Sequence, residues 1–177
     1  MDKNRRLTFY NLIRRFLRER RGASAVEFAI LAFPFLLLLF AILELCIVFA
    51  AQQLMANATD DLARQFRTGQ IKPDDINETE FRTMVCSRLG MLFPGDCPEL
   101  VIDLQSKDTF AEAAAIFNQE GIPASPQFDP GEALSKNVLR VYYRWPVLTD
   151  IMRERISNLG DGKTLLFTTH TWQNEPY

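Results

Sequence analysis

The sequence predicts an α+β protein in which one long N-terminal transmembrane helix extends into a small domain built on an antiparallel sheet. Three observations lead to this fold class: an apolar stretch long enough to span a bilayer, a helical pattern of apolar residues that continues beyond it, and three strand-like segments in the second half of the chain. With 177 residues, the chain has room for one modest domain and an anchor.

The first 22 residues are strongly basic. They carry eight Lys or Arg side chains against two carboxylates, a net charge of +6, whereas the whole chain carries −2, which leaves −8 for residues 23–177. Basic segments that flank a membrane span stay in the cytosol. We therefore predict a cytoplasmic leader over residues 1–22. Two other interpretations of these cations are nucleic-acid binding and an amphipathic helix that lies in the membrane interface.

The apolar stretch follows this leader directly. Between Ala25 and Ala51 only Glu27 and Glu44 are charged. A helix of that length reaches about 40 Å, which exceeds the hydrocarbon core of about 30 Å. A secretory signal peptide would have a shorter apolar stretch, of roughly 7–15 residues, followed by a small-residue cleavage site. The sequence thus predicts a retained transmembrane helix over about residues 25–51.

Helical spacing of apolar residues continues past the span. Gly69 and Pro73 end the pattern, so one helix is predicted from about Ser24 to Thr68. The apolar stripe on its outer half needs a partner. Residues 65–177 are expected to supply that partner as an α+β domain outside the membrane.

Three strands and three short helices are predicted in this domain. The strand segments are rich in β-branched or aromatic residues and roughly alternate in polarity; they are Leu100–Leu104, Val138–Trp145 and Thr164–Trp172. The helices are expected from Asn77 or Thr79 to about Met91, over Asp108–Gln119, and from about Val147 to Leu159, with a loop over Gly121–Gly131. We expect an antiparallel sheet with one covered face, for which the outer half of the long helix is the natural cover.

The three cysteines fit this topology. Cys46 lies in the span, and Cys86 and Cys97 lie beyond it, eleven positions apart. In an oxidising outer compartment the latter two can pair and leave Cys46 free. The other interpretation is that they are two unrelated small hydrophobic residues.

No catalytic constellation is recognisable. His170 is the only histidine, and it falls in a strand-like segment of threonines. The chain has no phosphate-binding loop, nucleophile elbow or zinc-ligand spacing. We predict that the protein is not an enzyme and that it uses no cofactor, metal or small-molecule substrate.

The most informative stretch is Arg20-Arg21-Gly22-Ala23-Ser24-Ala25-Val26-Glu27-Phe28. Glu27 is the fifth residue after Gly22, and a charge at membrane depth costs about 2.5–3.5 kcal/mol on insertion scales, less near an interface. Such a residue tends to be retained for a partner. The alternative is that Glu27 only extends to the cytosolic headgroups. Glu44, about 25 Å further along the helix, is then expected near the outer interface.

These residues resemble a known family. The stretch RRGASAVEFAILAFPFLLLLFAILELCIVFAAQQLMANATDDLAR, over about residues 21–64, is similar to the TadE-like domain of minor pilins from the bacterial tight-adherence (Tad) pilus system. Weaker similarity extends to three later segments, which are Phe128–Gly131, Val141–Pro146 and Asn174–Tyr177.

The resemblance implies a processing step and an assembly contact. Proteins of this kind are made as prepilins, and a membrane aspartyl peptidase cuts after the glycine that matches Gly22, so that Ala23 becomes the mature N-terminus. Major pilins usually have a bulky residue at the Ala23 position, where TadE-like proteins commonly have a small one. The glutamate that matches Glu27 is thought to pair with the N-terminal amine of a neighbouring subunit.

We therefore expect a minor pilin-like (pseudopilin) subunit of a Tad-type pilus. Its expected location is the bacterial inner membrane, with a cytoplasmic N-terminus and a periplasmic domain. The implied partners are the prepilin peptidase, other pilin-like subunits and the Tad assembly machinery; nucleic acid and small-molecule substrates are not among them. The alternative is an uncleaved single-pass protein whose periplasmic domain acts as a partner-binding scaffold or sensor.

Overall fold

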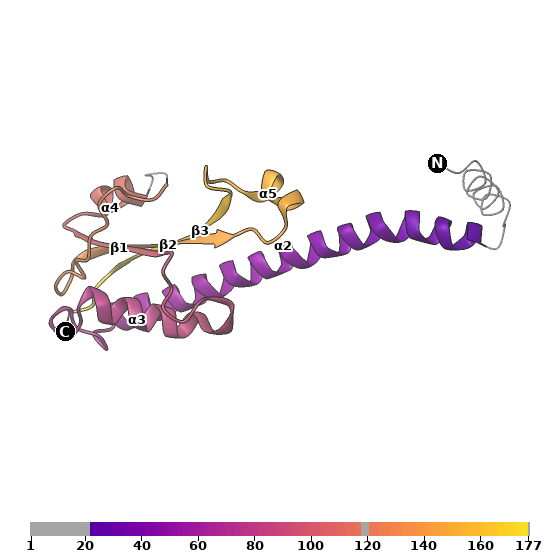
Figure 1. Cartoon of the computed structure of the whole chain (residues 1–177). Coiled ribbons are helices and arrows are strands. Elements are labelled where there is room, and N and C mark those ends of the chain that lie inside the picture. The colour runs from indigo at the N-terminus through magenta and orange to yellow at the C-terminus, as the bar shows by residue number, and fades with distance from the viewer. Residues whose placement is uncertain (1–21, 118–120, 177) are drawn as a thin grey trace, which may run out of the picture. The chain divides into compact units, whose positions relative to one another are not determined.

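We analysed a computed structural model of the chain, which describes residues 22–117 and 121–176 (Figure 1). Residues 1–21 of the leader that the sequence predicts over residues 1–22 lie outside the described residues. In chain order the elements are α2 (Ala23–Arg67), η2 (Pro73–Asp75), α3 (Glu78–Leu89), η3 (Gly90–Leu92), β1 (Leu100–Lys107), α4 (Phe110–Phe117), β2 (Lys136–Pro146), α5 (Asp150–Ile156) and β3 (Lys163–Gln173). The predicted α+β fold class, with its long N-terminal helix, is confirmed.

The long helix α2 passes from one compact unit of the chain into another. The first unit ends at Leu43, and the second comprises residues 44–177. Up to Leu43 the apolar side chains of α2 are mostly exposed, among them Phe28 and Phe35. Within the described residues, α2 is the one helix that is long and apolar enough to cross a membrane.

The second half of α2 is amphipathic and packs into the folded unit. Its buried apolar residues recur every three or four positions, which places them on one face of the helix. They are Ala51, Met55, Ala58, Leu62, Ala63 and Phe66. These side chains join one core with residues of the three strands and of α3. The expectation that the outer half of the long helix covers the sheet is therefore correct.

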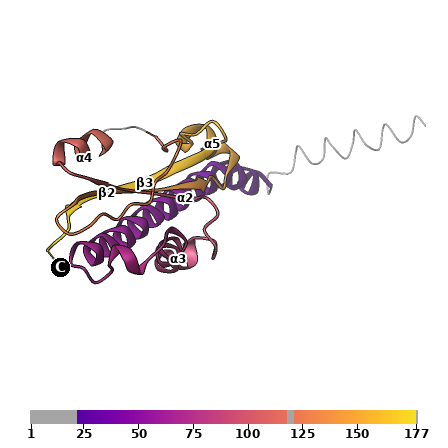
Figure 2. The ribbon, with the colours of Figure 1, turned by 90° about the vertical axis from the view of Figure 1, so that its left-hand side faces the viewer.

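The sheet has the order β1-β2-β3, and both pairings are antiparallel. Tyr143 in the central strand lies opposite Leu100 of β1 and Leu166 of β3. All three side chains are buried. Because side chains alternate between the faces of a strand, this register sets the face that packs on α2 and α3. Figure 2 shows α2 and α3 on one side of the sheet and α4 on the other.

The expectation of one covered face was incomplete, because the second face is partly covered as well. Ala113 of α4 packs on Val138 of β2, and both are fully buried. Beside them, Asp103 of β1 accepts hydrogen bonds from Arg140 Nε (2.9 Å) and Nη2 (2.7 Å) of β2. The same carboxylate accepts the backbone N–H of Gln127 at 2.9 Å. A buried charge needs such partners, and the loop before β2 helps to supply them.

Several boundaries differ from the predicted ones. β1 extends three residues further than predicted, to Lys107, because it continues to pair with β2 along its full length. The loop over residues 121–131 is not wholly irregular, since Phe128 forms a parallel bridge with Leu104 on the free edge of β1. α5 is shorter than predicted and begins at Asp150 with Thr149 as its N-cap residue. Of the two predicted caps for α3, Asn77 is the one used, in a capping box with Glu80.

Candidate functional site

The junction between Gly22 and Ala23 lies where α2 begins. Gly22 is exposed, and a Cβ added to it would meet no atom within 4 Å. Packing within the described chain therefore gives no reason for a glycine at this position. Because Ala23 is the first residue of α2, a break of the Gly22–Ala23 bond would leave the helix intact.

Glu27 lies one turn into α2, and its side chain is exposed. It makes no hydrogen bond or ion pair with any residue that the structure describes. Its neighbours Val26 and Phe28 are exposed apolar side chains. A carboxylate in such surroundings, once covered by lipid or protein, requires a hydrogen-bonding or cationic partner from elsewhere.

Glu44, the second carboxylate of the apolar stretch, is in a different situation. It is only 3% exposed. Its Oε1 accepts the backbone N–H of Leu148 at 2.6 Å and that of Thr149 at 3.3 Å, and its Oε2 accepts the hydroxyl of Thr149. Thr149 is the N-cap residue of α5, and its hydroxyl donates to Glu44 instead of capping the helix. Glu44 therefore holds the residues that precede α5 to the long helix.

Sequence reasoning missed this role of Glu44. It placed the residue near the outer membrane interface but gave it no partner. A separation of 104 residues between Glu44 and Leu148 leaves no local signal. The only hint is Thr149-Asp150, a helix-start pattern that lies away from the predicted start at Val147.

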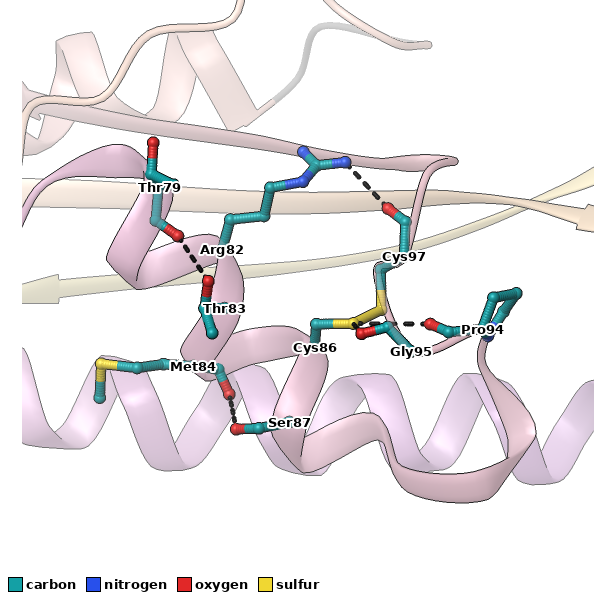
Figure 3. The surroundings of a disulfide bond; sticks show 9 residues. All are labelled: Thr79, Arg82, Thr83, Met84, Cys86, Ser87, Pro94, Gly95 and Cys97. Atoms are coloured by element: carbon teal, nitrogen blue, oxygen red, sulfur yellow. Dashed lines mark hydrogen bonds between the residues drawn. A yellow bond between two sulfur atoms is a disulfide. The ribbon is translucent and has the colours of Figure 1, made fainter.

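Cys86 and Cys97 form a disulfide bond, which joins α3 to the turn before β1 (Figure 3). Cys97 has a positive φ of 42°, a conformation that costs about 1 kcal/mol or more for a non-glycine residue. The N–H of Cys97 donates to the Pro94 carbonyl at 2.9 Å, and its carbonyl accepts Arg82 Nη2 at 2.9 Å. Cys46 is free and exposed.

The C-terminal tail is tied to the loop around residue 130 by one buried side chain. The amide of Asn174 donates to the carbonyls of Pro130 (3.3 Å) and Glu132 (3.0 Å). Its Oδ1 accepts Trp172 Nε1 at 2.8 Å and Asn137 Nδ2 at 2.9 Å. The contact brings together Phe128–Gly131 and Asn174–Tyr177, two segments in which the sequence suggested weaker similarity to the family. Both lie outside the residues that the family model matches.

His170, the single histidine, lies on β3 beside α2. Its Nδ1 is 3.5 Å from Asp60 Oδ1, and it is partly exposed. This is a surface contact between a strand and the helix that covers it. In the part of the chain that the structure describes, no group of three or more His, Cys, Asp or Glu side chains could hold a metal ion.

Comparison with known proteins identifies the N-terminal segment. The family model described as TadE-like protein matches residues 22–64. No curated protein and no solved structure matches the chain. The matched residues include Gly22, Glu27 and Glu44, together with most of α2. The resemblance predicted from the sequence is confirmed for this stretch, and residues 22–64 are a TadE-like segment.

Proposed function

We propose that this chain is a minor pilin-like (pseudopilin) subunit that supports the assembly of a Tad-type pilus and hence surface adherence. The observation that carries the proposal is the TadE-like segment over residues 22–64. It coincides with a helix that can span a membrane and whose N-terminal part leaves its apolar side chains exposed. Such a surface has to be covered by lipid or by the helices of other subunits.

The first step in this function is cleavage after Gly22 by a prepilin peptidase. The exposed position of Gly22 before α2 and the empty space around it support this assignment. A side chain at this position would obstruct the approach of the peptidase to the backbone, whereas it would disturb nothing in the described chain.

The second step is an intermolecular contact of Glu27. Cleavage would create an α-amino group at Ala23, about 6 Å along the helix from Glu27. A neighbouring helix that is displaced by about one turn would bring its own amine to the level of this carboxylate. Pairing relieves the desolvation of both charges, and removal of one charge would leave the other buried without a partner. The small residues Ala25, Ala29 and Ala32 allow the helices to approach closely.

The orientation is a cytoplasmic N-terminus and a periplasmic domain in the inner membrane. It rests on the basic leader, because positive charge flanking a span is retained in the cytosol. We expect a periplasmic reporter to be active when it is fused after Tyr177 and inactive when it is fused at residue 10. Activity of the N-terminal fusion in the periplasm would contradict this orientation.

The decisive experiment separates cleavage from assembly. A deletion strain is complemented with Gly22→Val, Glu27→Ala or the control Val26→Ala, and protein size and piliation are measured. We expect Gly22→Val to remain full-length in the membrane. Glu27→Ala should be cut normally yet fail to support pili, whereas Val26→Ala, at an exposed apolar neighbour, should be cut and should support them. Wild-type piliation with Glu27→Ala would show that this carboxylate is not the assembly contact.

The alternative function is an uncleaved single-pass protein whose periplasmic domain binds a partner as a scaffold or sensor. N-terminal sequencing of the membrane-extracted protein distinguishes the two functions. A pilin-like subunit should begin at Ala23, and the uncleaved alternative should retain the basic leader.

A further inference from the structure

The corner between β2 and α5 exposes an apolar side chain beside the long helix. Leu148 is 65% exposed, although its neighbour Val147 is buried. Its backbone N–H donates to Glu44 Oε1 at 2.6 Å, so the corner is held to α2 at one defined level. Within the folded unit, Figure 1 shows α5 beside the part of α2 that enters this unit.

The depth of Leu148 follows from its contact with Glu44. Side chains of an α-helix tilt toward its N-terminus, so the Glu44 carboxylate lies at or before the level of its own Cα. The exposed apolar surface of α2 continues further along the helix, through Ile47 to Phe49, which is 70% exposed. Phe49 lies about 7 Å beyond Glu44 along the helix axis. The corner is therefore at a level where α2 itself still presents apolar side chains outward.

Lipid is the occupant that fits this surface best. The exposed apolar side chains of α2 near this level, Ile47 and Phe49, belong to the helix that is long and apolar enough to cross a membrane. Polar side chains begin about one turn beyond Phe49, at the exposed Gln53, where Leu54 is still 37% exposed.

α5 begins two residues after Leu148 and carries two exposed arginines and two exposed carboxylates. Arg153 pairs with Asp150 at 3.0 Å, so Arg155 is the cation of α5 that is best placed to contact the phosphate of a lipid headgroup. An exposed apolar tip beside charged side chains, at a level where the long helix is still apolar, is the arrangement expected of an interfacial membrane contact.

We propose that Leu148 inserts into the periplasmic face of the bilayer and that the 146–149 corner is a second membrane contact of the outer domain. Glu44 acts as a positioning residue, because it fixes this corner to the helix that crosses the membrane. The domain then rests on the membrane at two points, the helix and the corner. This inference relies on the membrane orientation proposed above.

Depth-dependent fluorescence quenching tests the inference. The free Cys46 is first replaced by serine (Cys46→Ser). In this background one cysteine is introduced at a time, as Leu148→Cys, Phe49→Cys or Leu134→Cys. Each introduced cysteine is labelled with an environment-sensitive fluorophore. The full-length protein is placed at low density in vesicles of phosphatidylethanolamine and phosphatidylglycerol that contain lipids doxyl-labelled near the headgroup. Leu134 is the matched control: it is 51% exposed but adjoins Arg67, about 35 Å along α2 from Glu44.

We expect the probe at position 148 to be quenched to a similar degree as that at position 49, and several-fold more than that at position 134. Equal quenching at 148 and 134, with strong quenching at 49, would overturn the inference and leave the proposed function intact. The inference would also be overturned if the probe at position 148 entered an apolar environment only at high protein density. A second copy of the chain, and not lipid, would then cover the corner. Absence of quenching at position 49 would contradict the membrane orientation itself.

Discussion

Each half of α2 carries one carboxylate among apolar residues, and the two carboxylates differ in exposure and in hydrogen-bond partners. Glu27 is exposed and has no partner among the described residues, whereas Glu44 is buried and accepts three hydrogen bonds from the 148–149 backbone and the Thr149 hydroxyl. The folded domain thus supplies the hydrogen-bond donors that Glu44 requires. Glu27, in the same helix, is left available for a partner outside the described chain.

This difference separates the part of the helix whose carboxylate is satisfied within the folded domain from the part whose carboxylate is left for an outside partner. A residue that the domain satisfies contributes to the stability of that domain. A costly residue that the domain leaves unsatisfied contributes nothing there, so its retention points to lipid headgroups or to another subunit. Substitution by alanine should therefore lower the free energy of unfolding more for a carboxylate that is buried in the domain than for one that is exposed.

The largest effect is expected for a carboxylate that lies wholly inside the domain. Asp103→Ala would leave the guanidinium of Arg140 buried and would also remove the acceptor of the Gln127 N–H. Breaking a buried pair on one side typically costs about 3–5 kcal/mol. We expect a loss of this size in the free energy of unfolding, measured by denaturant titration in detergent with the two tryptophans, Trp145 and Trp172, as fluorescent probes.

The matched control is a carboxylate in a half-exposed ion pair. Asp61 lies 3.2 Å from Arg88 Nε, and both side chains are partly exposed. Pairs of this kind contribute less than about 1 kcal/mol. If Asp61→Ala were as destabilising as Asp103→Ala, burial would not be the reason for the effect.

An intermediate effect is expected for Glu44. Glu44→Ala would leave the part-buried N–H groups of Leu148 and Thr149 without their acceptor, and the loss of hydrogen bonds to a charged group costs about 1.5–3 kcal/mol. Glu44→Gln retains one oxygen acceptor and should lose less. Glu27→Ala should leave the unfolding free energy of the domain unchanged, because Glu27 lies outside the 44–177 unit. A similar destabilisation by Glu27→Ala and Glu44→Ala would remove the distinction between the two halves of α2.

The smallest effect is expected from a tyrosine on the second face of the sheet. Burial raises the pKa of Tyr142, the nearby Arg140 guanidinium lowers it, and the carboxylate of Asp103 raises it. Because the pKa of Tyr142 is higher in the folded state, its neutral phenol contributes to the stability of the fold. This contribution is complete below the unfolded pKa of about 10 and is lost as the pH rises through the folded pKa. We expect Tyr142→Phe to lose less stability than wild type between about pH 9 and 11; an identical loss would exclude a contribution from Tyr142.

The sequence allowed the fold class and most elements to be predicted, because these depend on local patterns. The apolar stretch and the helical spacing after it placed α2 to within one residue at each end. Alternation and β-branched residues located the three strands. The end of β1 and the start of α5 could not be placed, because long-range contacts decide them: pairing with Lys136 extends β1, and Glu44 fixes the residues before α5.

The candidate site divides in the same way. Gly22 and Glu27 could be proposed from the sequence because the pattern that singles them out is their order and spacing along the chain, which does not depend on distant contacts. The acceptor role of Glu44, the Asp103–Arg140 pair and the Asn174 contact with Pro130 were decided by the tertiary structure alone. Each joins polar groups at least 37 residues apart, and a polar side chain in a sequence does not reveal which distant donor or acceptor will satisfy it once water is excluded.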